Sequence, residues 1–230
     1  MQHEAPRCAA QPEALAAFLA LRVAAANAGF QLHPVSSFRD FATQCRIWNH
    51  KFAGERPLFD ADGNELSRAS MTEDETLSRI LDWTALPGAS RHHWGTEFDV
   101  VDLAGVAPGY RVQLLPQETR PGGVFHRLHR WLDDNIDRFG FFRPYARYQG
   151  GVQPEPWHLS YAPLAIPALA ALTLEVLAEA LVAAPIAGKP WVLAHLGELF
   201  DSHVHNIVLP SRRYGGFRHR MDCHVIPGTN

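Results

Sequence analysis

Hydrophobic and polar positions follow two different periods along the first half of the chain. Residues 12 to 28 carry an apolar stripe at helical spacing between Pro12 and Gly29, which suit the start and stop of a helix. An extended stretch predicts a strand near residues 31 to 37. A return to helical spacing then predicts a second helix over residues 40 to 52.

The next strand is indicated by alternating side chains. From residue 96 to 103 the alternation places Glu97 and Asp99 together on one face. Beyond this strand the pattern predicts, in chain order, a helix near 123–138, strands near 141–148 and 156–161, and helices near 164–182 and 190–203.

Residues 54 to 89 are interpreted as an irregular insertion. The acidic segment that starts at Asp60 begins like a calcium loop, but Met71 holds the twelfth position, where such a loop needs Glu. A turn at Gly63 is therefore expected instead. Because the insertion leads directly into Ser90, we expect it to form a wall or a lid of the pocket.

Interspersed helices and short strands favour an α+β fold, with helices packed around a small, largely antiparallel sheet. A chain of 230 residues with 47% hydrophobic residues is long and apolar enough for one compact domain. We therefore predict a single catalytic domain over residues 1–230, with a motif core at 30–161 and a helical extension at 162–230.

Charge and cysteine content exclude several classes of protein. Lys and Arg total 21 against 24 Asp and Glu, for a net charge of -3, so no nucleic-acid partner is expected. The Arg-rich segment from Ser211 to Arg220 is interpreted as a solvated tail. Cys8, Cys45 and Cys223 are odd in number and far apart, which argues against a disulfide framework.

No export or membrane segment is visible in the sequence. Residues 1–12 lack the basic and apolar run of a signal peptide, which predicts a cytoplasmic protein as given, or a periplasmic or cell-envelope protein if a leader was removed. The most apolar stretch, residues 161–184, is interrupted by Pro163 and Pro167 and carries Glu175. It is expected to be a packed amphipathic helix rather than a membrane span.

Candidate chemistry is concentrated in residues 90–99 and 155–158. A catalytic zinc ion takes three protein ligands and leaves one position for water. His92, Asp99 and His158 are predicted to be these ligands. Glu155, next to the third ligand, is predicted to be the general base that takes the proton of water and later gives it to the leaving amine.

The spacing of these residues differs from the helical HExxH pattern, in which both histidines share one helix face. Pro156 pushes Glu155 into extended geometry, and Gly95 allows the bend that returns His92 towards Asp99. His93 is expected to point away from the metal, because neighbouring side chains in an extended chain face opposite ways.

Two other histidine pairs are weaker candidates. His126 and His129 lie on the flank of the predicted helix 123–138, where they are interpreted as part of an amphipathic surface. His203 and His205 would share one face of a strand, but no third ligand or base lies nearby in the sequence. They remain the fallback metal site.

The pattern Ser-x-His-x-x-Gly-x-x-x-Asp, followed by Glu-x-x-His, resembles the VanY-like zinc D-alanyl-D-alanine carboxypeptidases and their VanX-like dipeptidase relatives. Residues 36–44, Ser-Ser-Phe-Arg-Asp-Phe-Ala-Thr-Gln, are similar to a third block of the family, and the three blocks occur in the expected order. The resemblance spans residues 30 to 161.

The resemblance implies one zinc ion bound by the three predicted ligands, with Glu155 as base. It also implies that Arg39 polarises the scissile carbonyl and stabilises the oxyanion, which suits a planar, always charged donor. Gln44 and Ser90 match positions that hydrogen-bond substrate. We add Trp157, between the base and the third ligand, as a candidate for substrate contact.

Two positions depart from the family pattern: Ser37 replaces a glycine, and Glu97 replaces a small residue. Because Glu97 shares a strand face with Asp99, we treat it as a hypothesis that Glu97 supports a metal ligand or selects a cationic group of the substrate. Unchanged zinc content, activity and substrate preference in Glu97→Ala would refute this hypothesis.

The predicted activity is zinc-dependent hydrolysis of a short peptide, of the D-alanyl-D-alanine carboxypeptidase or dipeptidase type, on peptidoglycan stem peptides. An L,D-carboxypeptidase and a cell-wall endopeptidase share the same metal chemistry, and the motif does not set stereochemistry. A third alternative is an inactive zinc-bound interaction module, although Glu155 and Arg39 are both present.

Overall fold

The N-terminal third of the chain forms the elements that carry the first sequence block. The computed structural model describes residues 2–4 and 7–211. Its first elements are strands β1 (Gln2–Glu4) and β2 (Arg7–Ala9), helix α1 (Pro12–Asn27), strand β3 (Leu32–Ser36) and helix α2 (Phe41–Ala53). The three elements predicted over residues 12–52 are confirmed. The β1–β2 hairpin was not predicted, because its strands are too short to show a period.

The middle of the chain contains two helices that were not predicted, one at Glu73–Trp83 and a short one at Pro116–Thr119. The elements are α3 (Glu73–Trp83), the 3-10 turn η1 (Arg91–Trp94), strand β4 (Glu97–Asp102), the short turn η2 (Leu103–Gly105), α4 (Pro116–Thr119), α5 (His126–Asn135), the turn η3 (Ile136–Phe139), and strands β5 (Phe141–Phe142) and β6 (His158–Tyr161). The interpretation of residues 54–89 as irregular was wrong over α3. A capping box between Thr72 and Glu75 starts this helix.

The C-terminal part is helical but more broken than predicted. Its elements are α6 (Ala162–Ala171), α7 (Leu174–Ala183), α8 (Lys189–Ala194), α9 (Leu196–Leu199) and the π-helical turn η4 (Phe200–His205). The single helix predicted over 164–182 was wrong, because Leu172 is extended and Thr173 caps a new helix by accepting a hydrogen bond from the Val176 amide. The helix predicted over 190–203 is likewise divided at His195.

The described residues contain a four-stranded sheet in the order β3-β4-β6-β5, and every neighbouring pair is antiparallel. This confirms the α+β class with a small antiparallel sheet. Strand β5 is much shorter than the predicted 141–148 strand, since Pro144 has no amide hydrogen to donate to a sheet. In β4 and β6, Asp99 lies directly opposite His158.

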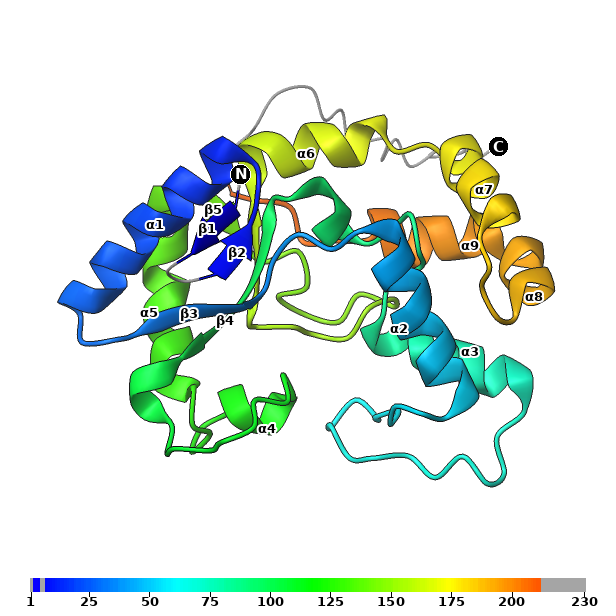
Figure 1. Ribbon diagram of the computed structural model, residues 1–230, viewed down its shortest axis with the longest axis horizontal. Coiled ribbons are helices and arrows are strands. Elements are labelled where there is room, and N and C mark those ends of the chain that lie inside the picture. Colours follow the sequence, from blue (N-terminus) through cyan, green and yellow to red (C-terminus); the bar gives the residue numbers. More distant parts are fainter. Residues whose placement is uncertain (1, 5–6, 212–230) are drawn as a thin grey trace, which may run out of the picture.

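Two hydrophobic clusters flank the sheet. One packs α1 and α5 against β4, with the rings of Phe18 and Phe98 stacked 4.1 Å apart. The other joins α2 and α3 to the C-terminal helices around the fully buried Trp48. Figure 1 shows these two halves on opposite sides, with α6 running from one to the other.

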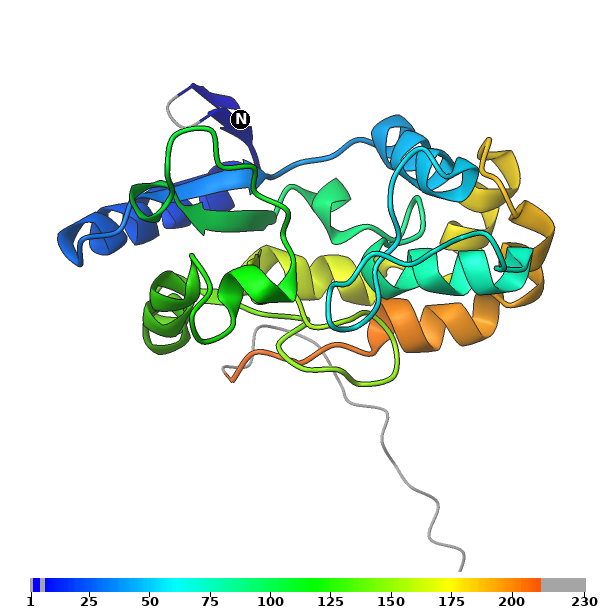
Figure 2. The same cartoon turned by 90° about the horizontal axis from the view of Figure 1, so that it is seen from below.

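The loop between α2 and α3 contacts helix α4 at a distance from the sheet. The loop between α2 and α3 turns at Gly63, as predicted, where φ is +81°. Its Asp62 accepts hydrogen bonds from Gln117 at the backbone oxygen (2.7 Å) and from Arg120 at the side chain (2.9 Å). Figure 2, seen from below, shows this loop and the α4 segment on the same side of the molecule.

Among the described residues, no single helix is long and apolar enough to cross a membrane. Helices α6 and α7 pass that test only as a pair, by length and composition, and the chain bends by 79° between them.

Candidate metal centre

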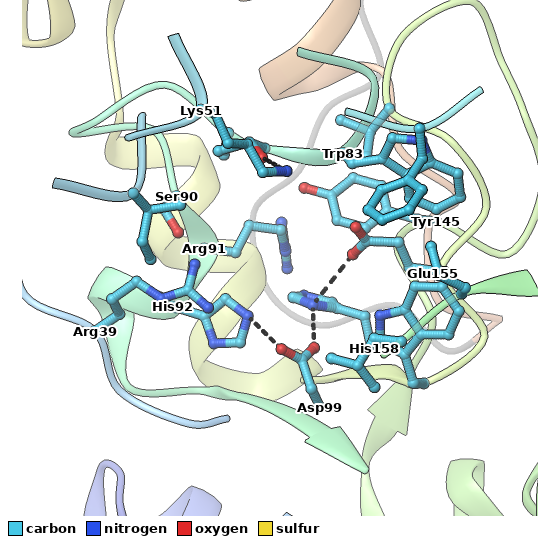
Figure 3. Close-up of a pocket in the computed structure, with 18 of the residues that line it drawn as sticks. Arg39, Lys51, Trp83, Ser90, Arg91, His92, Asp99, Tyr145, Glu155 and His158 are labelled. Carbon is cyan, nitrogen blue, oxygen red and sulfur yellow. Dashed lines mark hydrogen bonds and ion pairs between the residues drawn. The ribbon is translucent and has the colours of Figure 1, made fainter. Parts of the chain in front are cut away.

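Three side chains from separate elements converge on one point. Asp99 on β4 and His158 on β6 are paired across the sheet, and η1 brings His92 to them through a turn at Gly95, where φ is +69°. Asp99 Oδ2 lies 3.2 Å from His92 Nε2, and Oδ1 lies 3.0 Å from His158 Nδ1. Candidate ligand atoms of these buried residues lie within 4.8 Å of one another. Figure 3 shows the three side chains pointing toward one another.

In His92 and His158, the ring nitrogen that points away from Asp99 is hydrogen-bonded to the protein. His92 Nδ1 lies 2.7 Å from the Ser37 carbonyl oxygen, and His158 Nε2 lies 2.8 Å from Glu97 Oε2. Each ring therefore donates outward, which leaves His92 Nε2 and His158 Nδ1 facing Asp99. Such outer contacts set the tautomer of a metal-binding histidine.

Electrostatics at this point favour a positive charge. Burial lowers the pKa of His158, but the hydrogen bonds that its ring donates to Asp99 and Glu97 outweigh burial and raise the pKa to about 10. Although burial opposes ionisation, the neighbouring histidines hold the pKa of Asp99 well below its usual range. Two imidazole nitrogens beside an ionised carboxylate are a donor set that suits a divalent metal, zinc included.

Glu97, the position that departs from the family pattern, lies behind His158. Its carboxylate is fully buried and also accepts hydrogen bonds from Thr96 and Ser160, both at 2.8 Å. Arg91 lies 3.4 Å away and neutralises its charge. Of the two alternatives in our hypothesis, this geometry favours support of a metal ligand, because Glu97 does not line the cavity.

Glu155 stands beside the three predicted ligands. Its Oε2 is 3.6 Å from His158 Nδ1, and its side chain is 14% exposed. Burial is the main cause that raises the pKa of Glu155 to about 7, while the positive charges of His158, Lys51 and Arg39 oppose the shift. A carboxyl group in this position can exchange a proton near neutral pH.

Arg39 lies between β3 and α2, as the sequence predicted, and it lines the same cavity. Its guanidinium donates to Gln44 Oε1 at 2.9 Å and to Ser36 Oγ at 3.0 Å. Gln44 is fully buried, and its amide nitrogen donates to the Ala85 carbonyl oxygen at 2.7 Å. Gln44 thus holds Arg39 in place and does not itself line the cavity.

The cavity has a volume of about 280 Å³ and lies between the sheet and helices α2 and α3. Ser90 and Trp157, both predicted to contact substrate, line it. Further lining residues that the sequence analysis did not identify are Lys51, Trp83, Tyr145 and the segment Gln113–Leu115. No motif marks these residues, because distant parts of the chain come together only in the folded state.

The insertion contributes to the cavity as a wall. Arg56, Phe59, Thr84 and Ala85 all line it. The wall part of our expectation therefore agrees with the structure, and the movement of a lid remains a prediction.

The other histidine candidates point elsewhere. His93 Nδ1 lies 2.6 Å from the Arg39 carbonyl oxygen, and its Nε2 accepts the Gly88 amide hydrogen, so it faces away as expected. His129 is buried, which corrects its interpretation as surface. His203 and His205 lie on the π-helical turn η4, so the predicted strand face is wrong.

The remaining sequence expectations concern cysteines and the tail. Cys8 and Cys45 are buried free thiols, and Cys45 packs in the core around Trp48. Cys223 and all of the Arg-rich tail beyond Ser211 lie outside the described residues.

Two curated proteins are similar to part of this chain. The chain is 37% identical to an uncharacterised protein of Haemophilus influenzae over 121 residues, which cover 52% of this chain and 92% of that protein. It is 28% identical to a D-alanyl-D-alanine carboxypeptidase of Enterococcus faecalis over 110 residues, which cover 46% of this chain and 35% of that protein.

Two solved structures are also similar. VanYB in complex with D-alanine-D-alanine matches with a TM-score of 0.48 and 25% identity, over 69% of this chain and 74% of that one. A mutant of the vancomycin resistance D,D-pentapeptidase VanY in complex with Zn(II) matches with a TM-score of 0.47 and 25% identity, over 66% and 72% of the two chains.

The family model of VanY, described as D-alanyl-D-alanine carboxypeptidase, matches residues 7–164, which is more than half of the chain and includes all three sequence blocks. The chain therefore belongs to the VanY family of D-alanyl-D-alanine carboxypeptidases.

Proposed function

We propose that this protein is a zinc-dependent carboxypeptidase that removes the last residue of peptides ending in D-alanyl-D-alanine, such as peptidoglycan stem peptides. The observation that carries the proposal is the convergence of His92, Asp99 and His158 beside Glu155 and Arg39 in one cavity. Family membership supports the substrate class.

The residues fit a single zinc ion. His92, Asp99 and His158 would hold it through two imidazole nitrogens and a carboxylate oxygen, the number and type of ligands usual in catalytic zinc sites. The outward hydrogen bonds of both rings keep the inward nitrogens available. When bound in such a site, zinc polarises a carbonyl group and lowers the pKa of water.

The protein's own groups then account for proton movement and charge. Glu155 takes one proton from the attacking water and delivers it to the nitrogen of the leaving amino acid, so that the peptide bond and one water become a carboxylate and an amine. Arg39, held by Gln44 and Ser36, donates hydrogen bonds to the carbonyl oxygen as negative charge develops there. Ser90 and Trp157 line the space beside these groups.

The test is a comparison of amine release from D-Ala-D-Ala, a pentapeptide stem and an L,D-linked tetrapeptide by the zinc-loaded protein. We expect one zinc per chain and hydrolysis of the D,D-linked peptides, lost on chelation and restored by zinc. Preference for the L,D-linked peptide would favour the alternative carboxypeptidase. Zinc binding without any hydrolysis would indicate an inactive binding module, and a protein without zinc affinity would refute the site.

A further inference from the structure

Lys51 is a charged cavity residue that the proposed mechanism does not use. It lies in the last turn of α2, and its ammonium donates a hydrogen bond to Thr84 Oγ1 at 2.6 Å. Within residues 2–4 and 7–211 it forms no ion pair and no other side-chain hydrogen bond. The chain contains just two lysines, Lys51 and Lys189, so a lysine in this wall is unusual for this protein.

The side of the cavity around Lys51 is rich in positive charge. Arg39 and Arg56 line the same cavity. Burial is the main cause that lowers the pKa of Lys51 to about 8; Glu155 opposes this shift, and both arginines add to it. The carboxylate of Asp99, across the cavity, is already engaged with the two histidines. An anionic group of a ligand would therefore complement this wall.

Lys51 also lines the same cavity as Glu155, the proposed base. Its charge is near enough to Glu155 to lower the pKa of that carboxyl group. Figure 3 shows Lys51 and Asp99 on opposite sides of the cavity. In a peptide, the carboxylate carbon of the last residue is three bonds from the scissile carbonyl carbon, roughly 3 to 4 Å away. A receptor for that carboxylate must accordingly lie beside the catalytic groups.

We propose that the Lys51 ammonium, positioned by Thr84, binds the free α-carboxylate of the substrate's last residue and so restricts the enzyme to C-terminal cleavage. This inference rests on the proposed function. An internal peptide unit would put a neutral carbonyl or amide at the same place, so the ammonium would gain no anionic partner from the ligand. A charge-assisted hydrogen bond in a partly buried site gives a discrimination of about 100-fold.

The experiment compares two tripeptides that end in D-Ala-D-Ala, one with a free carboxylate and one with a C-terminal amide. For the wild-type zinc-loaded protein we expect kcat/KM to be about 100-fold higher for the free acid. Lys51→Met, which keeps the length of the side chain, should lower kcat/KM for the acid by a similar factor and change it little for the amide. Lys189→Met, which removes the same charge outside the cavity, is the matched control.

Other outcomes have distinct meanings. Equal losses of kcat/KM on both peptides would overturn the proposal. Lys51 would then affect catalysis by shifting the pKa of Glu155 or by stabilising the folded protein. No loss on either peptide would also overturn it. If the wild type cleaves neither peptide, the proposed function fails. The inference is then judged from calorimetric binding of the two peptides, in which the preference for the acid must disappear in Lys51→Met.

A second variant covers the case in which Lys51→Met does not fold, as judged by thermal unfolding. Thr84→Val removes only the hydroxyl group that accepts from the ammonium. It should weaken cleavage of the acid by about tenfold, the usual effect of one hydrogen bond, with little effect on the amide. Equal effects of Thr84→Val on both peptides would again overturn the proposal.

Discussion

Replacement of Glu97 by alanine tests whether this buried carboxylate supports His158, the proposed metal ligand in front of it. Glu97 Oε2 is 2.8 Å from His158 Nε2, and this contact leaves Nδ1 directed towards Asp99. Removal of such an outer partner typically weakens metal binding 10- to 100-fold, which corresponds to about 1.4 to 2.7 kcal/mol. We expect the zinc dissociation constant of Glu97→Ala to rise by that factor.

The same substitution also has a cost in stability. It leaves Arg91, which is 3% exposed, without its anionic partner. Breaking a buried pair from one side costs about 3 to 5 kcal/mol, so the metal-free variant should unfold at lower urea concentration. Arg91→Met in the same background should recover part of this loss, because the uncompensated charge is then removed.

Asp102→Ala separates the two effects. Asp102 is a buried carboxylate on the same strand, but it accepts hydrogen bonds from the backbone amides of Gln31 and Ala104 rather than from a proposed metal ligand. It should lower stability and leave zinc affinity unchanged. Zinc affinity is measured by competition with a chromophoric chelator. If Glu97→Ala binds zinc as tightly as Asp102→Ala does, the proposed support of His158 is wrong.

Three further predictions concern stability and the cavity wall. Burial, with the charge of Arg143, lowers the pKa of His129 from 6.5 to about 3. Protons then bind preferentially to the unfolded chain between these values, and about 2 kcal/mol of stability should be lost by pH 5; urea unfolding of His129→Gln should show a smaller loss. Glu118 accepts backbone hydrogen bonds from the loop that holds Leu114 at φ +55°, so Glu118→Ala should lower kcat/KM about 10- to 100-fold without loss of zinc, as kinetics and metal analysis would show. Phe98→Ala should lower the free energy of unfolding by about 3 to 5 kcal/mol, measured in urea, since its ring is fully buried against α1.

The sequence predicted most accurately those elements whose side chains have a clear period or cap. Helices α1 and α2 and strand β4 follow from apolar spacing, from Pro12 and from alternation after Gly95. Helix α3 could have been predicted as well, since Thr72 and Glu75 form a capping box before apolar residues at helical spacing. The acidic character of this stretch hid that signal.

Other differences depend on tertiary structure. The break between α6 and α7 lies at Leu172 and Thr173. Most residues around it favour a helix, so the apolar pattern does not mark the break. Only the cap at Thr173 shows where one helix ends and the next begins. The motif blocks predicted that His92, Asp99 and His158 come together, and the structure brings them together, with Asp99 paired opposite His158 across two strands. Lys51 and Tyr145 carry no such motif, and only the packing of α2 and the 143–157 loop brings them to the cavity.

In the proposed mechanism, Glu155 drives peptide hydrolysis at a zinc ion bound by His92, Asp99 and His158. This mechanism is tested most directly by the rate of D-alanine release from a D-Ala-D-Ala peptide by zinc-loaded wild type and Glu155→Gln. We expect one zinc per chain in both proteins and a rate at least about 100-fold lower in the variant, the usual minimum for loss of a general base. Equal rates in the two zinc-loaded proteins would contradict it.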